Sequence, residues 1–313
     1  MNTGSSREID AVCLMGPTAA GKTALAINLS QRFPVEIISV DSAQVYRGMS
    51  IGTGKPSAED LTRAPHHLID VVEPFHAYSA AEFRRDALQL ITEIKARGRI
   101  PLLVGGTMLY FRALKDGLAI MPMADKSVRS DIELQAKNRG WHSVHARLKE
   151  VDPVSAARIH PNDSQRIQRA LEVFMVSGKS ITCLQEDDKK VSQLSPSLLF
   201  FSIQPEDRSV LHSRIKSRFH MMLEMGFVDE VVALRERRDL DPTMASMRVV
   251  GYRQMWSYLD KALTYENAVE KSIAATRQLA KRQLTWLRSW PELNTSSHGL
   301  KPTLERLSST LKL

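Results

Sequence analysis

Short apolar runs alternate with a helix-like segment in the N-terminal part of the chain. Three mostly apolar runs are typical of buried strands: residues 11–15, 35–40 and 100–104. Residues 79–97 place apolar side chains at helical spacing, and Ser79 with Glu82 forms a capping box at their start. Strands separated by helices indicate βαβ units, so we predict an α/β fold built on a parallel sheet.

The pattern becomes purely helical between residues 121 and 192. Asp125 and Ser143 are suitable helix N-caps in this stretch. Pro161 together with Asn162 or Asp163 predicts the start of a further helix. The polar residues 186–196 predict a loop.

A strand-like run returns at residues 198–203 and is followed by helical patterns from 210 to 289. We therefore predict one α/β core with an all-helical insertion. Its parts are residues 1–120 (first part of the core), 121–192 (helical insertion domain) and 193–313 (core continued). Periodicity is weak after Pro291, which predicts a loosely packed tail.

Composition places the chain among ordinary globular proteins, with 43% hydrophobic and 25% charged residues. No apolar run is long enough for a membrane span or a signal peptide, which predicts a cytoplasmic protein. The two cysteines form no metal-ligand spacing, and Cys13 is expected to be buried in a strand. A net charge of +8 favours polyanionic partners, but solubility alone explains such a charge equally well.

A complete G-x-x-x-x-G-K-T motif directly follows the first predicted strand. It consists of Gly16, Pro17, Thr18, Ala19, Ala20, Gly21, Lys22 and Thr23. Strand, loop and helix in this order predict a core like that of P-loop NTPases. The loop N–H groups attract phosphate, Lys22 adds a full charge, and the Thr23 hydroxyl is suited to Mg²⁺. The sequence therefore predicts a phosphate-binding site, without naming the phosphate compound.

Polar or small residues follow two further predicted strands. Asp41 ends the second strand, and we expect its adjacent position in the sheet to bring it close to the phosphate loop. A carboxylate there serves as a turn cap, an indirect metal ligand or a proton acceptor. Gly105-Gly106-Thr107 stands where many nucleotide hydrolases have an aspartate, which weakens an ATPase interpretation. The two glycines indicate a tight turn or a close approach of a ligand or backbone.

Basic residues recur on three predicted helices. Arg166 and Arg169 accompany Gln165 on one of them, Arg214 and Arg218 share a face of another, and Arg277, Lys281 and Trp286 belong to the last. Each set fits either a nucleic-acid contact or a solvated helix face. Met221, Met222 and Met225 are expected to fill the core. Together with the phosphate loop, these patches favour an enzyme that joins a phosphorylated small molecule to a nucleic acid.

Five blocks, in the same order along the chain, resemble the bacterial tRNA dimethylallyltransferase (tRNA isopentenyltransferase) family. They are residues 16–23, 38–42 (ISVDS), 103–110 (LVGGTMLY), 160–163 (HPND) and 251–254 (GYRQ). The resemblance runs from about residue 9 to 290. It implies transfer of a dimethylallyl group from dimethylallyl diphosphate to N6 of adenosine 37, next to the tRNA anticodon.

The resemblance also implies roles for individual residues. Residues 16–23 would hold the diphosphate, Thr23 would ligate Mg²⁺, and Asp41 would be the general base, with Lys22, Thr23 and Arg218 completing the catalytic set. The insertion would grip the anticodon stem-loop of a tRNA bound by a monomeric enzyme. The implied tRNA-binding residues are Asp41, Ser42, Ala43, Gln44, Thr107, Arg129, Gln165, Arg166, Ile167, Gln168, Arg169, Thr243, Arg248, Arg277, Lys281 and Arg282.

Two other functions agree with the same residues. An ATP-binding small-molecule or nucleoside kinase would use the phosphate loop for a nucleotide. A non-catalytic RNA-binding protein would use that loop as a nucleotide switch. Asp41 beside Lys22 and Thr23 argues against the second alternative, because a switch without catalysis does not require this carboxylate.

Overall fold

The computed structural model describes residues 9–190, 195–205, 207–290, 292–296, 305 and 309. The chain divides into two compact units. One comprises Met1–Lys115 together with Pro196–Leu313, and the other comprises Asp116–Ser195. The predicted insertion at 121–192 lies within the second unit.

A six-stranded parallel sheet forms the centre of the first unit in the part of the chain that is described, in the order β3-β2-β4-β1-β5-β6. Its strands are β1 (Ala11–Met15), β2 (Val35–Val40), β3 (His66–His67), β4 (Ile100–Gly105), β5 (Leu198–Ile203) and β6 (Asn294–Ser296). The α/β prediction and its four strands are confirmed. β3 and β6 were not predicted because strands of two and three residues are too short to show a period. β6 pairs with β5, so the residues after Pro291 are not all loosely packed.

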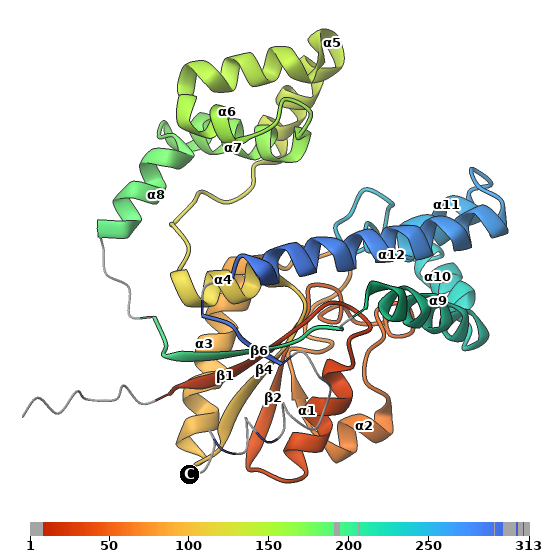
Figure 1. Cartoon of the computed structure of the whole chain (residues 1–313). Coiled ribbons are helices and arrows are strands. Elements are labelled where there is room, and N and C mark those ends of the chain that lie inside the picture. The colour runs from red at the N-terminus through yellow and green to blue at the C-terminus, as the bar shows by residue number, and fades with distance from the viewer. Residues whose placement is uncertain are drawn as a thin grey trace, which may run out of the picture. The chain divides into compact units, whose positions relative to one another are not determined.

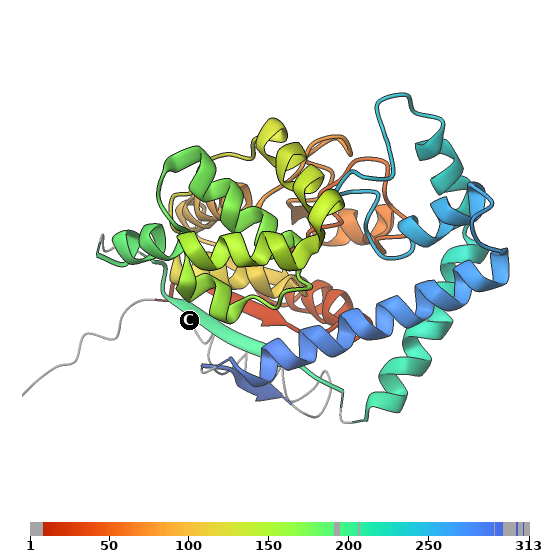
Figure 2. The ribbon, with the colours of Figure 1, turned by 90° about the horizontal axis from the view of Figure 1, so that it is seen from above.

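Eight helices accompany this sheet in the described residues. They are α1 (Lys22–Ser30), α2 (Ala58–Arg63), α3 (Ala80–Ala96), α4 (Met108–Asp116), α9 (Arg208–Glu224), α10 (Phe227–Arg235), α11 (Tyr252–Leu259) and α12 (Tyr265–Arg288). The capping box of Ser79 and Glu82 is confirmed at the start of α3. Figures 1 and 2 show α12 as one long helix that crosses the sheet and leads towards β6.

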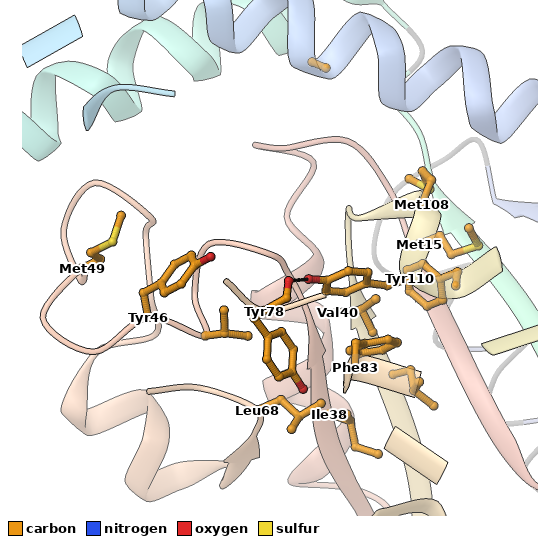
Figure 3. Close-up of a cluster of buried hydrophobic side chains, with 14 of the residues drawn as sticks. Met15, Ile38, Val40, Tyr46, Met49, Leu68, Tyr78, Phe83, Met108 and Tyr110 are labelled. Carbon is orange, nitrogen blue, oxygen red and sulfur yellow. Dashed lines mark hydrogen bonds between the residues drawn. The ribbon is translucent and has the colours of Figure 1, made fainter. Parts of the chain in front are cut away.

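Two apolar layers cover the faces of the sheet because alternate strand residues point to opposite sides. Val12 and Leu14 pack with α1, whereas Cys13 and Met15 pack with α3, α4 and the C-terminal helices. Cys13 is buried, as predicted. In the second layer, Figure 3 shows the rings of Phe83 and Tyr110, whose centroids lie 4.4 Å apart.

The helical unit contains α5 (Lys126–Val151), α6 (Pro153–Arg158), α7 (Ser164–Ser177) and α8 (Ile181–Lys190). Asp125 caps α5, as predicted, and of the two residues proposed for the start of α7 it is Asp163 that caps it. Ser143 is not a cap, because the break in α5 falls at Gly140, whose φ of 77° is left-handed. Residues 186–190 of the predicted loop belong to α8, and residues 191–194 lie outside the described part of the chain.

Candidate active site

The phosphate loop connects β1 to α1 and turns through two left-handed residues, Ala19 (φ 62°) and Gly21 (φ 90°). Gly16 leaves no room for a side chain, because a Cβ at this position would lie 2.7 Å from the carbonyl oxygen of Ile203 in β5. The loop N–H groups and the start of α1 therefore face the carboxyl edge of the sheet, where open α/β folds bind ligands.

Gln283 of α12 ties this loop to the neighbouring strand. Its Oε1 accepts from Thr18 N at 2.9 Å, and its Nε2 donates to the Gly106 carbonyl oxygen at 2.9 Å. A Cβ on Gly106 would lie 2.4 Å from that Nε2, so a side chain there would displace the amide. Gly106 thus permits the close approach of a side-chain amide, and the predicted close approach of another backbone occurs at Gly105, where a Cβ would lie 2.0 Å from the Val40 carbonyl oxygen.

Asp41 reaches the site differently from what the sequence suggested. Its strand, β2, is not adjacent to β1, because β4 lies between them. Gly105 at the end of β4 allows the ends of β4 and β2 to lie very close together, because a Cβ at this position would lie 2.0 Å from the Val40 carbonyl oxygen. Asp41 Oδ1 accepts from the N–H groups of Ala43 (2.8 Å) and Gln44 (3.3 Å). Asp41 is therefore a turn cap, while its carboxylate also lines the cavity described next.

A cavity of about 570 Å³ brings all four predicted catalytic residues together. They are Lys22, Thr23, Asp41 and Arg218, and Gln44 lines the cavity as well. The apolar part of its lining, here called the apolar wall, includes Phe219, Met222, Val249, Val250 and Leu279. The cavity thus combines cationic side chains with an apolar wall.

The charges in this cavity influence one another. Burial lowers the pKa of Lys22 to about 8, the Asp41 carboxylate opposes that change, and the Arg218 charge adds to it. Burial also lowers the pKa of Arg218, again opposed by Asp41. Lys22 Nζ donates to the Pro17 carbonyl oxygen at 2.8 Å. Two partly desolvated cations beside one carboxylate form a site that favours an incoming polyanion.

A loop at residues 50–56 contributes residues 52–56 to the lining of the cavity, and no sequence pattern predicted it. The Gly54 carbonyl oxygen accepts from Arg218 Nη2 at 3.4 Å and from Gln44 Nε2 at 3.2 Å. The loop is held by Glu230 of α10, whose carboxylate accepts from three consecutive N–H groups, those of Ser50, Ile51 and Gly52, at 2.7–3.1 Å. No local pattern marks Glu230, because its partners lie far away in the sequence.

The predicted core role of the α9 methionines is wrong for two of them. Met221 and Met225 are 56% and 66% exposed. Only Met222 packs partly against the core. Met221 and Met222 both line the cavity. Methionine side chains on a helix that borders a cavity can therefore line that cavity and not the core.

Three of the implied tRNA-binding residues take part in packing within the helical unit. Arg129 Nε and Arg169 Nη1 contact the fully buried Glu172 carboxylate at 2.8 and 2.6 Å. Burial alone would raise the pKa of Glu172, but these hydrogen bonds outweigh it and the pKa is lowered. The Ile167 side chain is completely buried and therefore offers no surface to RNA. Gln165 and Arg166 are exposed, and Gln168 bonds to Glu133.

The remaining implied tRNA-binding residues lie in the first unit. The Thr107 hydroxyl accepts from Ser42 N at 3.0 Å beside the cavity, and Thr243 and Arg248 are exposed in the segment before α11. Arg277 and Lys281 line a second cavity of about 220 Å³ between α9 and α12, and Arg282 is exposed. Trp286 is half-buried against the core, with the Arg112 guanidinium 5.8 Å from its ring centroid.

Metal clusters and membrane spans are both absent from the described residues. These residues contain no group of three or more His, Cys, Asp or Glu side chains suited to a metal ion. Among the helices that are described, none combines the length and apolar character needed to cross a membrane.

The parallel sheet, the loop between β1 and α1 and the cationic cavity define an α/β protein with a P-loop-like core. Family models agree with this class: that of IPP transferase matches residues 44–290, and that of isopentenyl transferase matches residues 9–74. The chain belongs to the IPP transferase family, whose members are prenyltransferases.

Individual relatives support the same assignment. The chain is 59% identical over 286 residues to a tRNA dimethylallyltransferase of Paraburkholderia phytofirmans, covering 90% of each. It resembles the crystal structure of tRNA isopentenylpyrophosphate transferase from Bacillus halodurans with a TM-score of 0.70 and 36% identity, covering 97% of this chain and 96% of that one. A eukaryotic dimethylallyltransferase described as acting on tRNA gives a TM-score of 0.76 at 26% identity, covering 97% and 77%.

Proposed function

We propose that this protein transfers the dimethylallyl group of dimethylallyl diphosphate to N6 of adenosine 37 in tRNA. The products are N6-(dimethylallyl)adenosine and diphosphate. The observation that carries the proposal is the convergence of Lys22, Asp41 and Arg218 on one cavity that also has an apolar wall. The name and 59% identity of the Paraburkholderia relative support the same reaction.

The cationic end of the cavity would bind and stabilise the leaving group. Breaking the allylic C–O bond leaves its electron pair on the diphosphate, where negative charge accumulates. The loop N–H groups, Lys22 and Arg218 are fixed donors suited to that charge. Val249, Val250 and Leu279 of the apolar wall would surround the five-carbon group and exclude water from it.

Asp41 would act on the other substrate. As the new N6–C bond forms, N6 must lose a proton, and the Asp41 carboxylate is the acceptor we assign. Adenosine 37 is stacked within an RNA loop, so it must be turned out of the stack to enter the cavity. The helical unit would hold the anticodon stem-loop. A monomeric state and a cytoplasmic location stay predictions.

The donor set fits Mg²⁺ bound mainly through the diphosphate. Mg²⁺ usually takes one or two protein oxygens and completes its shell with substrate phosphates and water. Thr23 supplies a hydroxyl at the start of α1, and both it and Asp41 line the cavity. When bound, Mg²⁺ would neutralise part of the charge on the diphosphate.

The proposal is tested by incubating the protein with dimethylallyl diphosphate and unmodified tRNA, then mapping the product nuclease fragments by mass spectrometry. We expect a mass increase on the fragment that contains adenosine 37, and none on a tRNA carrying guanosine there. Transfer to another nucleotide, or ATP-dependent phosphorylation of a small molecule, would contradict it.

The Lys22 pKa predicts a pH dependence of diphosphate binding. Only the protonated ammonium attracts diphosphate, so the Kd for inorganic diphosphate should rise as pH increases through about 8. Bound diphosphate should raise the Lys22 pKa again, so binding near that pH should take up a proton. Calorimetry in buffers of different ionisation enthalpy measures this uptake. Diphosphate also exchanges protons in this pH range, and this exchange is common to both proteins. Lys22→Arg should therefore remove only the Lys22 contribution, because guanidinium stays charged, and the same net uptake in both proteins would exclude Lys22 as a source.

Arg166 and Arg169 are expected to respond differently to replacement by Ala. Arg169→Ala leaves the buried Glu172 with one cationic partner fewer, so we expect the stability of the helical unit to fall by about 1.5–3 kcal/mol, the loss of one hydrogen bond between charged groups. Arg166 is 71% exposed, and Arg166→Ala should leave stability unchanged.

Arg166→Ala also tests tRNA binding. If Arg166 contacts a tRNA phosphate, its loss should lower the slope of log K for tRNA binding against log salt concentration by roughly one or less. Salt titrations of tRNA binding measure this slope, and thermal unfolding measures the stability of the two variants. Equal stability of Arg166→Ala and Arg169→Ala would contradict the packing role assigned to Arg169.

A further inference from the structure

Phe75 and His76 form an exposed pair of aromatic rings in the loop between β3 and α3. Phe75 is 43% exposed, His76 is exposed as well, and their ring centroids lie 4.6 Å apart. A large apolar ring left this open on a loop is not required by the core. Base stacking is one use for such a ring, because every nucleobase offers a flat π-face.

The loop that carries this pair is anchored on both sides. Before it, Pro74 is buried and its carbonyl oxygen accepts from the Ser246 hydroxyl at 2.5 Å. After it, Tyr78 is buried, and its carbonyl oxygen accepts from the Tyr110 hydroxyl at 3.0 Å (Figure 3). His76 N also donates to the Glu73 carbonyl oxygen at 3.0 Å. The two rings are therefore held on a fixed turn, which lowers the entropic cost of binding to them.

The same anchor connects the aromatic pair to the wall of the large cavity. Ser246, which holds Pro74, precedes Val249 and Val250 of the cavity wall by three and four residues. Because three extended residues span at most about 11 Å, the Cα atoms of Ser246 and Val249 lie within that distance of each other. Ion pairs adjoin the aromatic pair: Glu73, just before Pro74, pairs with Arg237 at 3.1 Å and Arg47 at 3.5 Å. Arg237 also pairs with Asp239 at 2.8 Å. The Arg47 side chain is 56% exposed, and its Nε donates to the Asp70 carbonyl oxygen at 2.9 Å.

We propose that Phe75 and His76 form a stacking platform for an unpaired nucleobase of the RNA substrate, outside the cavity that receives the target adenosine. This inference rests on the proposed function. A base next to the extruded adenosine loses its stacking neighbour, and an aromatic ring close to the cavity wall replaces that contact. The platform recognises the planar face of the base and not its sequence.

The test measures the affinity of the full chain for an RNA hairpin with the tRNA anticodon loop, using fluorescence anisotropy. Phe75→Ala should weaken binding by about 5- to 100-fold. Phe75→Trp should retain the affinity, whereas Phe75→Leu, which is apolar but not aromatic, should lose it. Val71→Ala is the matched control, because Val71 is 37% exposed in the same connection. The Kd for inorganic diphosphate should be the same in all variants.

A double-mutant cycle then locates the stacked base. Abasic substitutions are placed one at a time beside the target adenosine, and one of them should weaken binding to the wild-type protein but not to Phe75→Ala. Wild-type affinity in Phe75→Ala, or in Phe75→Leu, would overturn the platform. Prenyl transfer by the wild-type protein to the same hairpin tests the proposed function separately, so a failure of the platform alone leaves that transfer intact.

Discussion

Replacing Asp41 by Asn is expected to slow prenyl transfer by about 10²–10⁴-fold while diphosphate binding survives. The amide keeps an oxygen for the N–H groups of Ala43 and Gln44, so the turn after β2 should remain. It loses the negative charge and the capacity to accept the N6 proton. Single-turnover kinetics with saturating dimethylallyl diphosphate would measure the effect.

Asp60→Asn is the matched control for this substitution. Asp60 lines the same cavity, but its carboxylate caps α2 through Ser57. We expect little change in the transfer rate. Because the Asp41 charge also raises the pKa of Lys22, both variants should be compared well below the pH at which Lys22 deprotonates. A folded Asp41→Asn protein with near-wild-type turnover would remove the general-base assignment.

Gly54→Ala is expected to weaken diphosphate binding by about 10- to 100-fold, the loss of one charge-assisted hydrogen bond. A Cβ at this position would lie 1.6 Å from Arg218 Nη2. The guanidinium is the far end of a flexible side chain, so it should be pushed out of place while the fold persists. Gly54 also has a φ of 61°, which costs an alanine roughly 1–2 kcal/mol.

Gly48→Ala separates these two effects. Gly48 has a similar φ of 73°, but a Cβ at this position would have no neighbouring atom within 4 Å. Both variants should therefore lose similar stability on heating, and only Gly54→Ala should lose affinity for inorganic diphosphate in calorimetry. Equal diphosphate affinity in the two variants would mean that Arg218 does not act at the diphosphate site.

The sequence predicted those parts of the fold that depend on local patterns. Four strands, the phosphate loop and the Ser79 capping box follow from apolar runs and short motifs, which need no knowledge of distant residues. The convergence of Lys22 and Asp41 on one sheet edge was also predictable, because the carboxyl ends of parallel strands share an edge. The expectation that the strand of Asp41 lies next to β1 was wrong, because β4 lies between β2 and β1. The order of strands in a sheet depends on the whole chain and not on a local pattern.

Residues that act over long sequence separations could not be predicted. Gln283 bonds to Thr18 from 265 positions away, and Glu230 holds a loop from about 180 positions away. Arg129 and Arg169 looked like a surface for RNA because nothing in the sequence shows that Glu172 is buried between them. Hydrophobic type alone likewise could not show that Met221 and Met225 are exposed.

The central claim is that the phosphate loop holds an allylic diphosphate that leaves, and not a nucleotide that donates phosphate. It is tested most directly with dimethylallyl diphosphate labelled with one isotope in carbon and another in phosphorus. The account predicts that the carbon label enters tRNA while an equal amount of phosphorus label is released as diphosphate. ATP labelled in its terminal phosphate should transfer none. Phosphorus label in the product, or turnover of ATP without carbon transfer, would contradict the account.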